Sequence, residues 1–175
     1  MSNQVVSWSL FIIPWLTLFF MKRDEIRRYM PVGVFATLIT VLINDVGIRN
    51  GFWVVNNPIY PFNEMLPAHY GLVPVLLLWF FKYTNGRFWL YFIGNAVLDV
   101  GFVYYFINVF LWSRGLYALV GISSFMVWLI SVGTAVIIYL YQMWQEGKLV
   151  PAFKEIVSPK LRLAETKPFF KNTED

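Results

Sequence analysis

Cysteine is absent from this sequence of 175 residues, and histidine occurs once. Without cysteine the chain can form neither a disulfide nor a thiolate metal site. A single histidine excludes a histidine-rich metal cluster. Charged residues are also scarce, at 14% of the chain, where soluble proteins carry about 25%. We therefore predict no metal site and no cofactor.

Apolar residues dominate instead, with 58% hydrophobic and 20% aromatic residues. A soluble domain of this size buries too little surface to hide so much of it. A bilayer core of about 30 Å needs roughly 20 mostly apolar residues per helix. Five stretches qualify, at 5–21, 31–48, from 62 or 66 to 83, 88–112 and 116–144. The predicted fold is an all-α integral membrane bundle of five transmembrane helices over 1–144, with a basic tail at 145–175.

Lysine and arginine predict the orientation, because cytoplasmic segments carry an excess of them. Twelve of the 14 fall on one predicted side: Lys22, Arg23, Arg27, Arg28, Lys82, Arg87, Lys148, Lys154, Lys160, Arg162, Lys167 and Lys171. The N-terminus is therefore expected outside and the C-terminus in the cytoplasm. The first stretch has no basic residue before it and no small-residue cleavage site, so we expect it to be retained.

The tail at 145–175 is polar and interrupted by prolines, so one long helix is not expected there. It either docks a partner or lies along the anionic inner leaflet. Because topology accounts for the basic residues, we expect a lipid bilayer as the partner and no nucleic acid.

Asp99 is the only Asp, Glu, Lys or Arg of the fourth stretch, and it lies near the centre of that stretch. At 1.5 Å per residue it is roughly 16 Å beyond Phe88, close to the bilayer midplane. A charged Asp there costs at least about 2.5–3.5 kcal/mol, so it should point into the bundle. Asn95 precedes it by one turn on the same face. Ser131 and Thr134 are the expected neighbours at the same depth.

Two interpretations of the Asn95/Asp99 pair stay open. In the first, it is a site for a small ligand, an ion or a proton, as intramembrane ionisable residues often are. In the second, Asp99 is a protonated hydrogen-bonding residue that packs helices in a structural or accessory subunit, alone, as a homo-oligomer or with a membrane-protein partner.

A secondary polar site is predicted from Asn44, Asp45, Arg49, Glu64 and His69, which flank the connection between the second and third stretches. Asp45 and Arg49 are spaced to pair with each other at i, i+4. That connection is either an ordered outer loop or a shallow re-entrant segment. An enzyme could use Glu64 or His69 as a general base, but no nucleophile, phosphate or metal motif accompanies them. We therefore expect no enzymatic activity.

Small residues on the fifth stretch predict close helix packing at Gly121, Ser124, Ser131 and Ala135. The triplet Asp-Val-Gly occurs at 45–47 and again at 99–101, which is compatible with a duplicated helical hairpin.

The stretches "IPWLTLFFMKRDEIRRYMPVGVFATL" and "FKYTNGRFWLYFIGNAVLDVGFVYY" resemble a family of small multi-span membrane proteins from endospore-forming Firmicutes. The resemblance rests on an aromatic first span ending in a basic run, a proline opening the second span, and Asn95 with Asp99. It covers about two thirds of the chain, without the outer loop and the tail. It implies a multi-pass protein of the bacterial plasma membrane, and it supplies no activity.

Overall fold

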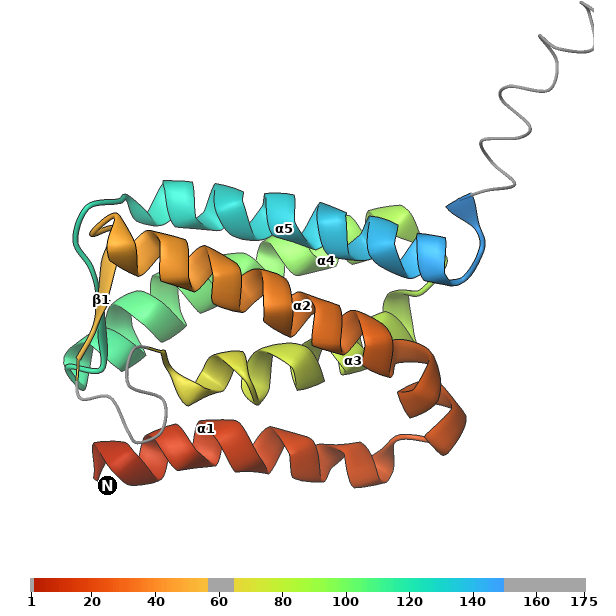
Figure 1. Ribbon diagram of the computed structural model, residues 1–175, viewed down its shortest axis with the longest axis horizontal. Helices are drawn as coiled ribbons and strands as arrows, with labels where there is room; N and C mark the ends of the chain where they lie inside the picture. Colours follow the sequence, from red (N-terminus) through yellow and green to blue (C-terminus); the bar gives the residue numbers. More distant parts are fainter. Residues whose placement is uncertain (1, 57–64, 150–175) are drawn as a thin grey trace, which may run out of the picture. The chain divides into compact units, whose positions relative to one another are not determined.

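The computed structural model describes residues 2–56 and 65–149 (Figure 1). The chain divides into two units, Met1–Tyr139 and Leu140–Asp175. The elements are α1 (Asn3–Thr17), the 3-10 turn η1 (Leu18–Phe20), α2 (Arg23–Arg49), β1 (Trp53–Val55), the 3-10 turn η2 (Pro67–His69), α3 (Leu72–Thr84), α4 (Phe88–Val100), the π-helix η3 (Gly101–Leu111), β2 (Tyr117–Leu119) and α5 (Ser124–Gln145). All packing below lies within the first unit, which includes α5 up to Tyr139.

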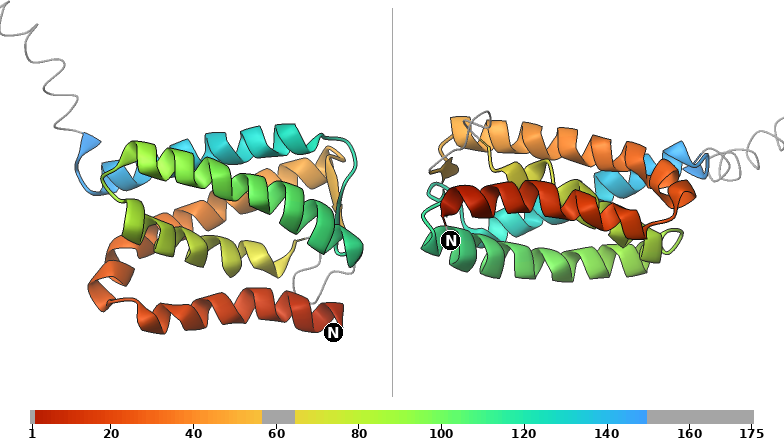
Figure 2. Two further views of the ribbon diagram at one scale, coloured as in Figure 1. Left: turned by 180° about the vertical axis from the view of Figure 1, so that it is seen from behind. Right: turned by 90° about the horizontal axis from the view of Figure 1, so that it is seen from below.

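Within the described residues, four helical segments are long and apolar enough to cross a membrane: Asn3–Phe20, Arg23–Arg49, Phe88–Leu111 and Ser124–Gln145. Large apolar side chains are exposed on them, for example Phe19 at 84% and Val97 at 65%. Continuous exposed apolar surface of this kind marks a membrane or partner surface. The helices run side by side in all three views (Figures 1 and 2), which agrees with the predicted helical bundle.

Three predicted helix starts were wrong. The third helix, α3, begins at Leu72 and not near Phe62 or Leu66. The second helix begins at Arg23 instead of Pro31, so the basic run forms the first turns of α2. The Lys22 backbone N–H donates to Glu25 Oε2 at 3.2 Å. This bond stabilises the first turn, and a carboxylate near the N-terminus of a helix also interacts favourably with the helix dipole. Glu25 also pairs with Lys82 Nζ at 3.0 Å, which links the start of α2 to the end of α3. The fifth helix begins at Ser124 instead of Leu116.

A two-stranded antiparallel sheet replaces the expected start of the fifth helix, so the prediction of a purely α-helical fold is corrected. β1 pairs with β2 in the register Trp53↔Leu119 and Val55↔Tyr117. Below, the end of the unit that carries β1 and β2 is called the strand end. Trp53 is buried there, with its ring stacked on Tyr117 at 6.4 Å between centroids. Gly47 of α2 makes room for it, because a Cβ at Gly47 would collide with the indole.

α1 and α3 approach closely where Pro14 lies inside α1. Proline has no N–H, so the Leu10 carbonyl loses its helical donor. Gly71 packs against this point, and a Cβ there would lie 2.6 Å from Leu10 O and 2.5 Å from the Phe11 Cα. Trp15 Nε1 also donates to the Tyr70 carbonyl at 3.1 Å. The contact therefore depends on a glycine at position 71.

The π-helix η3 buries a face that repeats every four residues, at Val103, Ile107 and Leu111. A π-helix has i→i+5 hydrogen bonds and is wider than an α-helix, which suits this spacing. Phe102, Phe106 and Phe110 stack along a neighbouring face, with ring centroids 5.3 and 5.5 Å apart. Because η3 is apolar apart from Asn108 and two tyrosines, its sequence carries no periodicity that would distinguish it from an α-helix.

Candidate functional site

Asp99 lies in the last turn of α4, directly before the π-helix begins at Gly101. Asn95 Nδ2 donates a hydrogen bond to Asp99 Oδ2 at 2.8 Å, so the predicted pair exists. Both side chains are partly buried and neither is sealed in the core. Long π-helical segments are rare and are often found at functional sites. The carboxyl group therefore stands at a change of helix type in the middle of an apolar segment.

Two hydrogen bonds join α4 to α5 near this pair. Tyr91, one turn before Asn95, is fully buried, and its hydroxyl donates to the Ala135 carbonyl at 3.1 Å. Trp128 Nε1 of α5 donates to the Ala96 carbonyl at 3.0 Å. The ring of Tyr91 also lies 5.0 Å from that of Tyr139. These contacts fix α4 against α5 around Asp99 without using the carboxyl group itself.

The expected neighbours at the depth of Asp99 play a smaller part. Thr134 Oγ1 donates to the Ile130 carbonyl of its own helix at 2.7 Å, and Ser131 is partly buried. Sequence reasoning missed Tyr91 and Trp128, whose polar atoms face α5 and α4 respectively. Nothing in their spacing separates them from the other aromatic residues of these apolar helices.

The packing residues predicted on the fifth stretch have different roles. Gly121 lies before α5, where a Cβ would meet the Gly51 carbonyl oxygen at 2.6 Å, so its place on the helix was wrong. Ser124 Oγ accepts from Asn108 Nδ2 of η3 at 2.7 Å, another contact not foreseen from the sequence. Ala135 is buried, and its carbonyl oxygen accepts the hydrogen bond from the Tyr91 hydroxyl.

The secondary polar site separates into two pairs on different faces of α2. Asn44 is buried and points toward His69 of η2, with Asn44 Nδ2 and His69 Nε2 2.9 Å apart. The Leu66 carbonyl, 3.1 Å from His69 Nδ1, can only accept a hydrogen bond. Nδ1 therefore carries the proton and Nε2 accepts from Asn44, which defines a neutral histidine.

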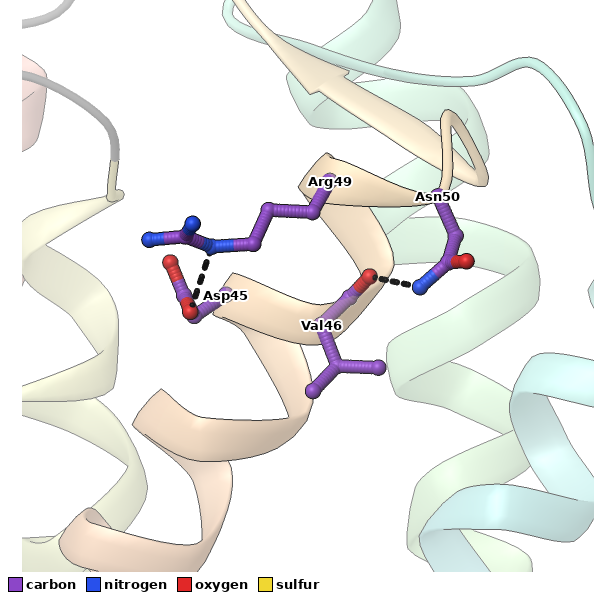
Figure 3. A network of polar contacts seen from close by, with 4 residues as sticks. All are labelled: Asp45, Val46, Arg49 and Asn50. Carbon is purple, nitrogen blue, oxygen red and sulfur yellow. Dashed lines mark hydrogen bonds and ion pairs between the residues drawn. The ribbon is translucent and has the colours of Figure 1, made fainter.

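Asp45, the next residue on α2, contacts Arg49 (Figure 3). Arg49 Nε donates to Asp45 Oδ2 at 2.8 Å, the i, i+4 pair that the spacing predicts. Exposed pairs of this kind contribute about 0.3–0.5 kcal/mol. Glu64 lies outside the described residues, as do residues 150–175 of the basic tail. Among the described residues, no group of three His, Asp or Glu side chains is placed to hold a metal ion.

The two Asp-Val-Gly triplets occupy different environments. Gly47 is packed against Trp53, whereas a Cβ at Gly101 would meet nothing within 4 Å. Asp45 pairs with an arginine four residues later, and Asp99 with an asparagine four residues earlier. The structure thus gives the repeated triplet no shared role.

At the strand end, burial raises the pKa of the Tyr117 phenol above its usual value.

Comparisons with known proteins give no relative. A scan against protein-family models and searches of curated proteins and of solved structures found no match to this chain.

Proposed function

We propose that this chain is a multi-pass integral membrane protein without enzymatic activity, whose Asn95/Asp99 pair binds a proton or a small cation within the bilayer. The bacterial plasma membrane is the proposed location, with the N-terminus outside. The four long apolar helices support insertion. The basic residues at the α1–α2 and α3–α4 connections support the orientation, because both connections lie at the end opposite the strand end (Figure 1).

Five crossings require α3 to complete the topology, although its 13 residues span only about 20 Å. Irregular backbone at membrane depth is tolerated where protein buries it. Leu66, Ala68 and His69, which precede α3, are 4%, 3% and 8% exposed. We therefore propose that a buried re-entrant segment and the short helix α3 together form the third of the five crossings.

One observation carries the proposal for Asp99: the hydrogen bond that it accepts comes from Asn95 of its own helix. Within residues 2–56 and 65–149 no hydrogen bond joins its carboxyl group to another helix. A packing role would need such a bond across helices. Tyr91 and Trp128 already join α4 to α5, so the carboxyl group is available for another purpose.

The chemistry of the pair suits a cation. Asn95 occupies one lone pair of Asp99 Oδ2 through its amide N–H. The other carboxylate oxygen and the Asn95 amide oxygen are acceptors only. A proton or a small cation at these oxygens would neutralise a charge that is costly at the bilayer centre. Asp99 is partly buried, so its carboxyl group is not enclosed in the core.

The access of water to position 99 tests the proposal. Because the chain lacks cysteine, a single cysteine introduced at this position can be labelled selectively. Asp99→Cys would be reacted with a small membrane-impermeant thiol reagent in sealed vesicles. Two controls match it: Val97→Cys on the exposed apolar face and Val103→Cys, whose side chain is fully buried. We expect labelling at 99 and none at 97 or 103.

The opposite result would support the structural alternative. A thiol at 99 that reacts only after unfolding in detergent indicates a dry interface. Asp99 would then be a packing residue of a structural or accessory subunit, and cross-linking would reveal a homo-oligomer or a membrane-protein partner.

A further inference from the structure

A groove of about 400 Å³ runs between α1, α2 and α3, and neither Asn95 nor Asp99 lines it. Six residues of α2 form one wall: Met30, Gly33, Val34, Thr37, Leu38 and Val41. The remainder of the lining is Trp15 of α1, Tyr70, and Pro74 and Leu78 of α3. Val34 and Leu38 are 62% and 55% exposed, so no element within the described residues covers this face of α2.

The polar atoms that border the groove are already bonded within the protein. Thr37 Oγ1 donates to the Gly33 carbonyl at 3.0 Å. Trp15 Nε1 donates to the Tyr70 carbonyl at 3.1 Å. An occupant of the groove therefore meets satisfied polar groups and apolar side chains, which suits a hydrocarbon chain.

The length of the groove corresponds to one leaflet. Met30 and Val41 lie about 16 Å apart along α2 at 1.5 Å per residue. Half of a bilayer core of about 30 Å is about 15 Å. The wall on α2 is thus as long as the acyl region of a single lipid.

Two arginines continue the same face of α2 beyond the groove. Arg23 and Arg27 precede Met30 by seven and three residues, and such spacing places residues on one helix face. They lie about 10 and 4 Å before Met30 along the axis, at headgroup level if the groove holds an acyl chain. Both are exposed. Two acids lie in the same turn: Glu25 pairs with Lys82 at 3.0 Å, and the exposed Asp24 precedes Arg27 by three residues.

We propose that this surface binds one anionic phospholipid of the leaflet on the basic side, with an acyl chain in the groove and the phosphate at Arg23 and Arg27. Charge complementarity selects this occupant, because the apolar groove ends at two cations and a helix of another protein would need no such charge. Lysine and arginine at a membrane surface attract anionic lipids. The proposal rests on the membrane insertion proposed above.

Native mass spectrometry of the full chain, purified from vesicles that contain equal amounts of phosphatidylglycerol and phosphatidylcholine, tests it. We expect one phosphatidylglycerol to stay bound. Arg23→Gln with Arg27→Gln should weaken its retention relative to phosphatidylcholine roughly 30-fold, if each charge contributes about 1 kcal/mol. Val34→Trp should displace it by filling the groove.

Matched controls remove the same charge or add the same side chain elsewhere. Arg28→Gln with Arg87→Gln takes two charges from the same end, and Val97→Trp adds an indole to an equally exposed face of α4. Both should retain the lipid. Equal lipid retention in all variants would overturn the proposal, as would a homodimer that Val34→Trp alone disrupts. If alkaline washing releases the chain from membranes beforehand, membrane insertion itself fails, which separates the two proposals.

Discussion

Replacing Asp99 with Asn should change the free energy of unfolding in opposite directions under the two interpretations of this residue. The amide has nearly the same shape, and its oxygen can still accept from Asn95 Nδ2, now 2.8 Å from Asp99 Oδ2. What the change removes is the ability to carry a negative charge. If Asp99 is held for binding and not for packing, this substitution should raise the free energy of unfolding.

The expected gain follows from the position of the residue. A charged Asp at the centre of a membrane helix costs about 2.5–3.5 kcal/mol, and partners and water reduce that cost. Asp99 is partly buried and accepts one hydrogen bond, which offsets on the order of 1 kcal/mol. We therefore expect Asp99→Asn to be about 1 kcal/mol more stable than the parent, with loss of cation binding. Such exchanges of function for stability are common at binding sites.

Reversible unfolding in mixed micelles, followed by tryptophan fluorescence and circular dichroism, measures this change. Asn95→Ala is the matched control. It leaves the carboxyl group without its donor and should lower the free energy of unfolding by about 0.5–1.5 kcal/mol. If Asp99→Asn lowers stability by about 1 kcal/mol instead, as expected for lost cross-helix bonding, the carboxyl group packs helices and the reasoning is refuted.

The remaining predictions concern packing and use the same unfolding assay. Gly47→Ala should lose about 1–3 kcal/mol, because the added methyl group collides with the buried Trp53 ring. Gly71→Ala should lose about 2–3 kcal/mol, because its Cβ would lie 2.5 Å from the Phe11 Cα, a backbone atom that cannot rotate away. Tyr91→Phe should lose about 0.6–1.7 kcal/mol through its hydroxyl bond to α5.

Gly133→Ala is the control for both glycine substitutions, since a Cβ there meets nothing within 4 Å. It should be neutral or stabilising by up to about 1 kcal/mol, as Ala favours a helix over Gly. If Gly71→Ala behaves like this control, α1 and α3 are not in close contact. For Tyr91, the substitution by Phe removes only the hydroxyl, so an unchanged free energy of unfolding in Tyr91→Phe would show that the hydroxyl bond to α5 contributes nothing.

Local sequence features indicated much of the helical pattern because long apolar runs have few alternatives to a helix in a membrane. The start of α2 was missed, although Glu25 follows Lys22 at the spacing of a capping residue. The prediction from long apolar runs places a helix only where the residues are apolar. It excluded the charged turns at Arg23 to Arg28, which continue the helix beyond that run.

The i, i+4 relations of the candidate site were readable from the sequence, and both Asn95–Asp99 and Asp45–Arg49 follow from helical spacing alone. The pairing of Trp53–Val55 with Tyr117–Leu119 was not, because two short strands far apart in the chain carry no mutual signal. The Asn44–His69 bond likewise depends on where η2 folds back against α2.

The sequence by itself thus determined that the long apolar runs form helices, though not where each helix begins. It also determined where the charges accumulate, and that one carboxyl group lies in the middle of an apolar helix. Only the tertiary structure decided that α4 changes into a π-helix beside Asp99, and that Tyr91 and Trp128 make the bonds between α4 and α5. The physical reason is that apolar and aromatic side chains cover every side of these helices. Composition then fixes their membrane character, while the contact of each face depends on the shape of its neighbours.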